Sequence, residues 1–199
     1  VTGVQTCALP IYWDFGTGDW SIGCRLQVVD TAATWKSVIN IGNYAAGTNG
    51  LQFYINGTNI IIWRTGQAQG TLGGVISTIN TWYHVVISRS GNDMIVYFNG
   101  TSNIISSSIS GSFGNSVSNT HLGYNSQGSS LYHEGVIDNA FVYKGRALSQ
   151  SDVNFLYNGG AGLNYNSLTA GMKTNLVAWW DLRSEEHTSE LQSPCNLVC

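Results

Sequence analysis

The sequence predicts an all-β fold: an antiparallel β-sandwich with one short helix after the last main strand. The 199 residues include 24 glycines and only 2 prolines, and 12% of them are aromatic. Short runs of alternating apolar and polar residues recur about every 8–12 residues, which is the spacing of strands in sandwiches. Asn56-Gly57 and Asn99-Gly100 stand between such runs, and Asn-Gly is the strongest short signal for a hairpin turn.

The first strand is predicted at residues 20–28, where apolar side chains occupy every second position. One face carries Trp20, Ile22, Cys24, Leu26 and Val28, and the other carries Ser21, Gly23, Arg25 and Gln27. This alternation is typical of a strand with one face in the core and the other in solvent. Further strands are expected at residues 37–41, 50–55, 59–64, 82–88, 94–99, 104–105, 120–124 and 135–143.

One helix is predicted after these strands, because residues 149–152 form a capping box. The Ser149 hydroxyl and the Asp152 carboxylate can accept hydrogen bonds from the free backbone N–H groups of the first turn. Gly159 and the glycine after it are expected to end this helix. A second short helical turn is expected near residues 169–173.

The two ends of the chain are interpreted as translated sequencing-adapter DNA, so the chain is expected to be a metagenomic fragment. One codon choice for residues 1–11 has a reverse complement that encodes RSEEHTSELQS, the sequence of residues 183–193. A natural domain has no physical reason to carry both strands of one DNA segment. We therefore set aside residues 1–11 and 183–199 as artefact before reasoning about the fold. The alternative is a natural acidic tail.

The charge and the hydropathy pattern exclude two classes of function. Lys and Arg total 8 against 11 Asp and Glu, which gives a net charge of −3. Since there is no basic excess to neutralise phosphates, no nucleic acid is expected as a partner. No window of about 18 apolar residues occurs, so no membrane insertion is expected.

Four motifs identify a family resemblance. They are Asp19-Trp20-Ser21-Ile22, Trp82-Tyr83-His84-Val85, Val96-Tyr97-Phe98-Asn99-Gly100, and residues 135–143 followed by Arg146-Ala147-Leu148-Ser149. In this order they resemble the laminin-G-like jelly-roll domains of the concanavalin-A-like lectin/glucanase superfamily. The resemblance implies an antiparallel jelly-roll β-sandwich.

The resemblance also implies that the domain is truncated at its N-terminus. Domains of this kind open with a strand similar to residues 176–182, LVAWWDL, and no such strand precedes Tyr12. We therefore expect a laminin-G-like sandwich over residues 12–160. Residues 161–182 are then a linker and an opening strand that resembles the start of a second domain.

The same LVAWWDL segment has a predicted place in the sandwich. A sheet without its opening strand leaves unpaired backbone groups and an apolar stripe at its edge. We predict that residues 177–182 fill this edge, in the same chain or by exchange between chains, as donor strands complete other sheets. Trp179 and Trp180 would then face opposite sides of the sheet. The alternative is that the segment is the unpaired stump of a second domain.

No catalytic site is expected, so the chain is predicted not to be an enzyme. The related glucanases need two neighbouring carboxylates, because retaining hydrolysis uses paired carboxyl groups about 5–5.5 Å apart. The acidic residues here are scattered, at Asp14, Asp19, Asp30, Asp93, Glu134, Asp138, Asp152 and Asp181.

Aromatic residues on outward faces are the candidates for ligand binding. An exposed ring can stack on the apolar face of a sugar, while polar groups bind the hydroxyls. The aromatic candidates are Trp35, Tyr54, Trp63, Tyr124 and Tyr132, and the polar candidates are Arg25, Arg64, Asn125 and His133. Trp63 and Arg64 are expected at the centre of this platform. For each candidate the alternative is packing within the fold.

No cofactor is required, and the resemblance implies one metal, a structural calcium ion. Asp138 lies in the strand whose matching acid binds calcium in some members of the superfamily. The alternative is that Asp138 accepts hydrogen bonds from backbone amides at a bulge.

The expected function is that of a non-catalytic binding module in a larger adhesin-like or virion-tail protein. Its location would be extracellular, at the cell surface or on a virion, and its partner a glycan or an extracellular surface protein. The alternative is a structural spacer or oligomerisation domain without a small ligand. An exposed aromatic cluster would favour binding over the spacer.

Overall fold

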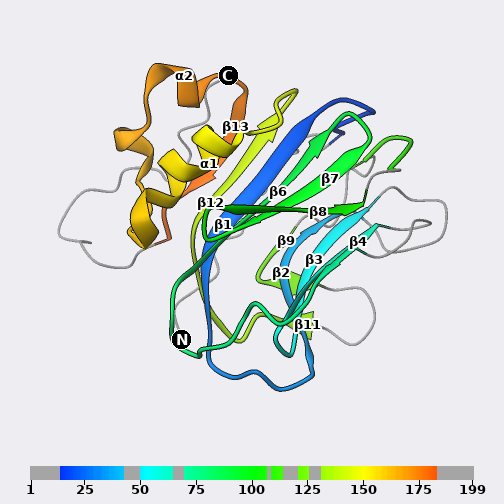
Figure 1. Ribbon diagram of the computed structural model, residues 1–199, viewed down its shortest axis with the longest axis vertical. Helices are drawn as coiled ribbons and strands as arrows, with labels where there is room; N and C mark the ends of the chain where they lie inside the picture. Colours follow the sequence, from blue (N-terminus) through cyan, green and yellow to red (C-terminus); the bar gives the residue numbers. More distant parts are fainter. Residues whose placement is uncertain are drawn as a thin grey trace.

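The structure is a computed structural model that describes residues 14–42, 50–64, 70–106, 109–113, 121–125 and 131–182 (Figure 1). Two antiparallel sheets pack face to face, which confirms the predicted jelly-roll sandwich. The segments interpreted as adapter-derived, residues 1–11 and 183–199, lie outside the described residues, so that interpretation stays a prediction.

The strands are divided between a larger and a smaller sheet. Six strands form one sheet, in the order β13 (Leu176–Trp180), β12 (Gly135–Lys144), β1 (Trp20–Val28), β6 (Tyr83–Ser90), β7 (Asp93–Phe98) and β8 (Thr101–Ser106). Five strands form the other, in the order β5 (Gly70–Leu72), β4 (Asn59–Arg64), β3 (Leu51–Asn56), β2 (Trp35–Ile41) and β9 (His121–Leu122). A separate hairpin consists of β10 (Tyr124–Asn125) and β11 (Leu131–Tyr132).

Turn chemistry explains where several strands begin and end. Gly57, with a φ of +59°, forms the turn between β3 and β4, and Asn99 and Gly100, both with positive φ, form the turn between β7 and β8. The strand expected at residues 120–124 is divided into β9 and β10, because Gly123 between them has a φ of +72°. The short strand β5 was not predicted, since its three residues carry no apolar alternation.

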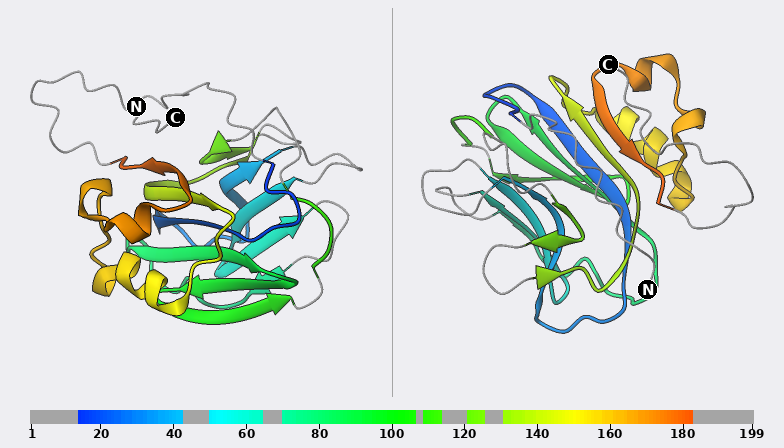
Figure 2. Two further views of the ribbon diagram at one scale, coloured as in Figure 1. Left: turned by 90° about the horizontal axis from the view of Figure 1, so that it is seen from above. Right: turned by 180° about the vertical axis from the view of Figure 1, so that it is seen from behind.

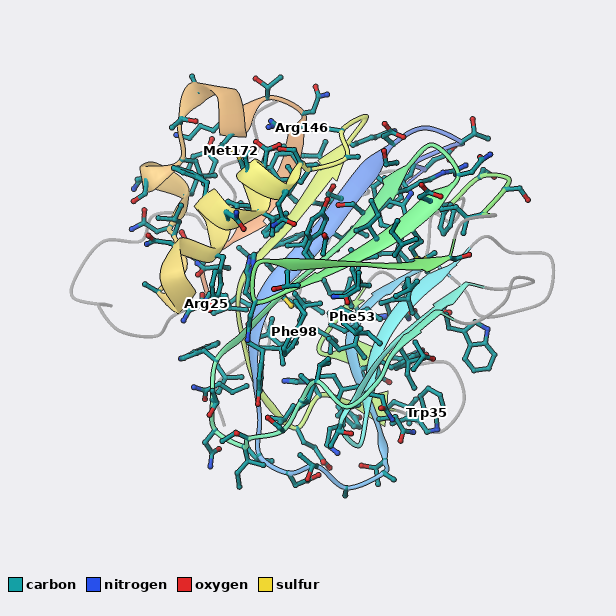
Figure 3. All side chains as sticks on the ribbon, in the orientation of Figure 1. Arg25, Trp35, Phe53, Phe98, Arg146 and Met172 are labelled. Atoms are coloured by element: carbon teal, nitrogen blue, oxygen red, sulfur yellow. The ribbon has the colours of Figure 1, made fainter. Side chains whose placement is uncertain are left out.

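The main core lies between the two sheets. Its buried side chains come from the inward face of every long strand and include Trp20, Ile22, Leu26, Val38, Ile41, Phe53, Ile55, Ile60, Ile62, Val85, Ile87 and Val96. Phe53 and Phe98, which Figure 3 labels, lie in this layer. The alternation in residues 20–28 therefore assigned the core face of β1 correctly.

The other face of β1 is also buried, which corrects the expectation that it faces solvent. Ser21 and Arg25 are both buried, because a helical cap formed by residues 148–175 covers this side of the six-stranded sheet (Figure 2). A second apolar cluster fills the space between sheet and cap, from Val86, Tyr97, Phe141, Tyr143, Leu148, Val153, Leu156, Leu168 and Met172. The Tyr143 hydroxyl donates to the Met172 carbonyl at 2.7 Å and fixes the cap on the sheet.

The cap contains helix α1 (Gln150–Tyr157), the 3₁₀ turns η1 (Asn158–Gly160) and η2 (Tyr165–Ser167), and helix α2 (Ala170–Lys173). The predicted capping box is present at the start of α1, with the Ser149 N–H 3.0 Å from Oδ2 of Asp152. The helix ends at Asn158, which has a left-handed φ of 47°, one residue before the expected glycine. None of the helices in the described ranges is long and apolar enough to cross a lipid bilayer.

The first five residues of the LVAWWDL segment form β13, which joins the edge of the six-stranded sheet and pairs with β12 of the same chain. The strand ends at Trp180, two residues before the predicted end at residue 182. Trp180 packs against the main core. Trp179 lies on the opposite face, in the cluster under the helical cap, where its ring stacks on Phe141 at 5.4 Å between centroids. The predicted edge position and the opposed tryptophans are therefore present in this structure.

Candidate functional site

The outer face of the five-stranded sheet collects side chains that the core does not use. Along β3, Leu51, Phe53 and Ile55 point into the core, so Gln52 and Tyr54 point to the other side. Residues directly opposite in an antiparallel pair share a face. The register therefore places His121, Asn40, Gln52 and Trp63 in one row across β9, β2, β3 and β4.

Five aromatic residues lie in or beside this row, and we call them the aromatic rim: Trp35, Tyr54, Trp63, Tyr124 and Tyr132. The Trp35 ring lies 5.5 Å from the Tyr54 ring and 6.3 Å from the Trp63 ring, between centroids. Trp35 is 37% exposed and Tyr132 is 60% exposed, so the rim reaches the surface. In Figure 3, Trp35 lies on the side of the sheet away from Phe53.

Polar side chains without a charge lie beneath the rim, and we call Ser37, Asn40 and Gln52 the amide floor. All three are 0% exposed. Within the described part of the chain, the Ser37 hydroxyl, both polar atoms of Asn40 and both polar atoms of Gln52 have no hydrogen-bond partner. Native proteins leave few buried polar groups unsatisfied, so this concentration is unusual.

The β10–β11 hairpin lies against β2 and completes the rim (Figure 1). The Asn125 amide donates to the Tyr54 hydroxyl, which ties β10 to β3. The Gly123 N–H donates to the Val38 carbonyl at 2.8 Å, which ties the start of the hairpin to β2. The Tyr124 and Tyr132 rings then stand 4.9 Å apart between centroids.

The electrostatics of this face are nearly neutral. The strands of the five-stranded sheet and the β10–β11 hairpin contain no Asp or Glu. Burial lowers the pKa of His121, because it disfavours the charged form of the ring. Lys36 is buried at the beginning of β2, where its ammonium group pairs with Asp30 at 2.9 Å and donates to the Thr34 hydroxyl. Among its described side chains, the face therefore offers rings and amides rather than charge.

The structure brings together most of the residues predicted to bind a ligand. All five predicted aromatic candidates are in the rim, and Asn125 anchors it. The expectation that Tyr54 is exposed is wrong: it is only 4% exposed, because it lies between Trp35 and the Asn125 amide. Arg64 is on β4, and its side chain lies outside the described part. His133 is not in the rim, because its Nε2 faces the Gln27 carbonyl at 2.9 Å beside β1.

Arg25 does not join this site, because it belongs to the opposite sheet. It is buried beneath the helical cap, where its Nη2 donates to the Gly160 carbonyl at 2.8 Å. Its guanidinium group also lies 4.6 Å from the Trp82 ring centroid, within cation–π range. Arg25 therefore fastens the cap to the sheet.

Asp138 accepts hydrogen bonds from backbone amides, which is the arrangement given above as the alternative to calcium binding. Its Oδ1 accepts from the backbone N–H groups of Asn139 at 2.7 Å and Leu182 at 3.1 Å. The pairing of β1 with β12 shifts register at this point, between Gly23 and Arg25. Across the described ranges, no three His, Cys, Asp or Glu side chains are placed to hold a metal ion together.

The amide floor is the part of the site that we did not predict from the sequence. A signal exists, because Asn40 and Gln52 are polar residues inside apolar strands, next to Ile39 and Ile41 or to Leu51 and Phe53. The two polar residues indicate a single site only if they lie opposite each other on neighbouring strands. That register includes a bulge between Ser37 and Ile39, which no sequence periodicity shows.

A family model matches most of the chain. The Laminin_G_3 model, described as Concanavalin A-like lectin/glucanases superfamily, matches residues 3–154. The match begins inside the segment that we interpret as adapter-derived. No curated protein sequence matches the chain.

Solved structures with low sequence identity share the fold. A heptameric SAP-like pentraxin from Limulus polyphemus has a TM-score of 0.52 and 15% identity, with 81% of each chain covered. Domain 4 of AbnA, a GH43 extracellular arabinanase from Geobacillus stearothermophilus, solved with arabinotriose, has a TM-score of 0.56 and 17% identity, with 71% of this chain and 68% of that chain covered. A Trypanosoma rangeli sialidase has a TM-score of 0.55 and 16% identity, but the similarity covers 74% of this chain and only 24% of the sialidase.

Proposed function

Because the chain belongs to the concanavalin A-like lectin/glucanases superfamily, we propose that it is a non-catalytic module that binds carbohydrate on the outer face of its five-stranded sheet. The observation that carries this proposal is the aromatic rim around the amide floor. Rings stack on the apolar faces of sugars, and unpaired amides can bind their hydroxyls. The face therefore offers both kinds of contact that a sugar needs.

The lack of carboxylates argues against glycoside hydrolysis at this face. Hydrolysis needs a pair of Asp or Glu residues flanking the scissile bond. The strands that form the face contain neither residue. The role proposed for the face is accordingly to hold a sugar rather than to cleave it.

Its likeness to carbohydrate-associated domains supports an extracellular role. The arabinanase domain of the same fold was solved with arabinotriose, and its parent enzyme is extracellular. By analogy, the present chain is proposed to be an adhesin-like or virion-tail module that acts outside the cell. Its partner would be a surface glycan, free or carried by an extracellular protein.

A glycan array probed with the full chain tests the proposal. We expect the chain to bind a defined set of oligosaccharides and Trp63→Ala to weaken that binding about tenfold or more, because truncating a stacked aromatic anchor removes a large share of the affinity. Phe155→Ala is the matched control, since Phe155 is an exposed ring on α1, in the cap on the other sheet.

Three results would overturn the proposal. Binding of no glycan at all would leave the structural spacer or oligomerisation domain as the better account. Equal loss of binding in both variants would show that the rim is not the binding surface. Unfolding of Trp63→Ala would assign Trp63 to the packed part of the fold.

A further inference from the structure

The amide floor restricts the chemistry of the ligand more sharply than the aromatic rim does. Rings stack on many sugars, whether neutral or charged, so the rim alone does not discriminate between them. The floor lies deeper, and its groups are completely buried. A ligand that contacts Asn40 and Gln52 must match their hydrogen-bonding capacity, because both side chains are completely buried.

The unpaired groups of the amide floor lower the stability of the folded domain when no ligand is bound. A buried polar group without a partner lowers folding stability by about 1–3 kcal/mol. An apolar side chain of the same shape avoids this loss. Asn40 and Gln52 each present an amide oxygen and an amide nitrogen without a partner in the described part of the chain. This repeated cost points to a binding role for these groups.

The position of the two amides suits a single sugar residue. Asn40 and Gln52 are directly opposite each other on β2 and β3. Opposite side chains in an antiparallel pair have Cβ atoms about 4.5–5.5 Å apart, so both amides can contact one ring. Trp63 is opposite Gln52 on the next strand, which places a stacking surface beside the amides.

The charge of the ligand follows from the groups around the floor. An amide both donates and accepts, as a hydroxyl does, so the two are complementary. A carboxylate or sulfate in this position would need a cation, and a buried charge without a partner is strongly disfavoured. Lys36 is already paired with Asp30 and Glu134, and burial lowers the pKa of His121, which disfavours its charged form. The floor therefore favours an uncharged ligand.

We propose that the amide floor is the specificity-determining subsite of this module and that its ligand is an uncharged, hydroxyl-rich saccharide. This inference rests on the proposed carbohydrate-binding function. A hydroxyl pair of one sugar ring contacts Asn40 and Gln52, while Trp63 covers the apolar face of the ring. Because the floor is completely buried, a sugar reaches it only after the side chains that cover it have moved aside.

The test combines stability with binding, because the inference predicts opposite effects on the two. We expect Gln52→Met and Asn40→Leu to raise the thermal midpoint of the chain without ligand by about 2 °C or more, since each removes unpaired buried groups. The same variants are expected to bind neutral pentose and hexose oligosaccharides at least about tenfold more weakly. Gln27→Met is the matched control, a half-buried glutamine on β1, and is expected to change neither quantity.

The probes separate failure of this inference from failure of the proposed function. The array carries neutral oligosaccharides beside sialylated, sulfated and uronic-acid oligosaccharides. Binding confined to the acidic probes overturns the inference and leaves carbohydrate binding intact. Unchanged binding by both variants, a lowered midpoint in both, or failure of both to fold also overturns it, because the amides would then serve the protein itself. Binding to no probe overturns the proposed function, and the inference with it.

Discussion

Acidification is expected to destabilise the domain through His84, a buried histidine on β6. Its ring lies between the rings of Phe141 and Tyr157, at 6.4 and 5.9 Å between centroids. In the part of the chain that the structure describes, its Nδ1 has no hydrogen-bond partner. Burial, and secondly the positive charge of Arg25 directly opposite on β1, lower the pKa of His84 from 6.5 to about 4.

The sign and size of the effect follow from proton linkage. Because the pKa is lower in the folded protein, the unfolded chain binds the proton first as the pH falls, and folding stability decreases between about pH 6.5 and pH 4. Integrating over the two pKa values of His84 gives a loss of about 2.5 kcal/mol between pH 7.5 and pH 4.5. This is a large share of the roughly 5–15 kcal/mol that stabilises a typical domain.

Urea denaturation of the wild-type chain and of His84→Phe at both pH values measures this effect. We expect the wild type to lose about 2.5 kcal/mol more than the variant on acidification. The other titrating groups, including His121 and His133, are present in both proteins and cancel in the comparison. Equal losses in the two proteins, within about 0.5 kcal/mol, would refute a buried neutral His84.

Three further predictions concern the fold. Gly23→Ala is expected to lower the thermal midpoint by more than about 2 °C. The reason is steric, because a Cβ at Gly23 would lie 2.5 Å from the Phe141 ring and 2.8 Å from the Val85 carbonyl oxygen. An unchanged midpoint would show that the strands can separate to make room for the added methyl group. The backbone amides of β13 are expected to exchange slowly with deuterium, and fast exchange throughout β13 beside protected central strands would contradict its place in the sheet. Deleting residues 1–11 and 183–199 is expected to leave the thermal midpoint within about 4 °C, and a larger fall would show that these ends pack on the domain.

Local signals in the sequence were sufficient for most of the sandwich. The turn after Asn56, the capping box at Ser149 and the alternation in residues 20–28 each depend on a few neighbouring residues, and each is present in the structure. The edge strand β13 was predictable because its composition resembles the opening strand of domains in the family that the four motifs indicate.

Long-range packing explains what the sequence did not predict. The alternation in β1 cannot show that the helical cap buries Arg25, because the cap comes from residues more than 120 positions later. The aromatic candidates were predictable one by one as outward residues. Their proximity to Asn40 and Gln52 depends on the register of β2 with β3, which includes a bulge between Ser37 and Ile39. No local sequence pattern determines that register.

An NMR titration tests the central claim most directly, with the full chain and the neutral oligosaccharide that binds best on the array. We predict that the side-chain amide signals of Asn40 and Gln52 and the indole N–H signal of Trp63 shift with one common affinity. The indole signals of Trp82 and Trp179, which lie with the helical cap on the other sheet, are predicted to stay in place. Shifts confined to the cap, with unchanged signals from Asn40, Gln52 and Trp63, would contradict a binding site on the five-stranded sheet.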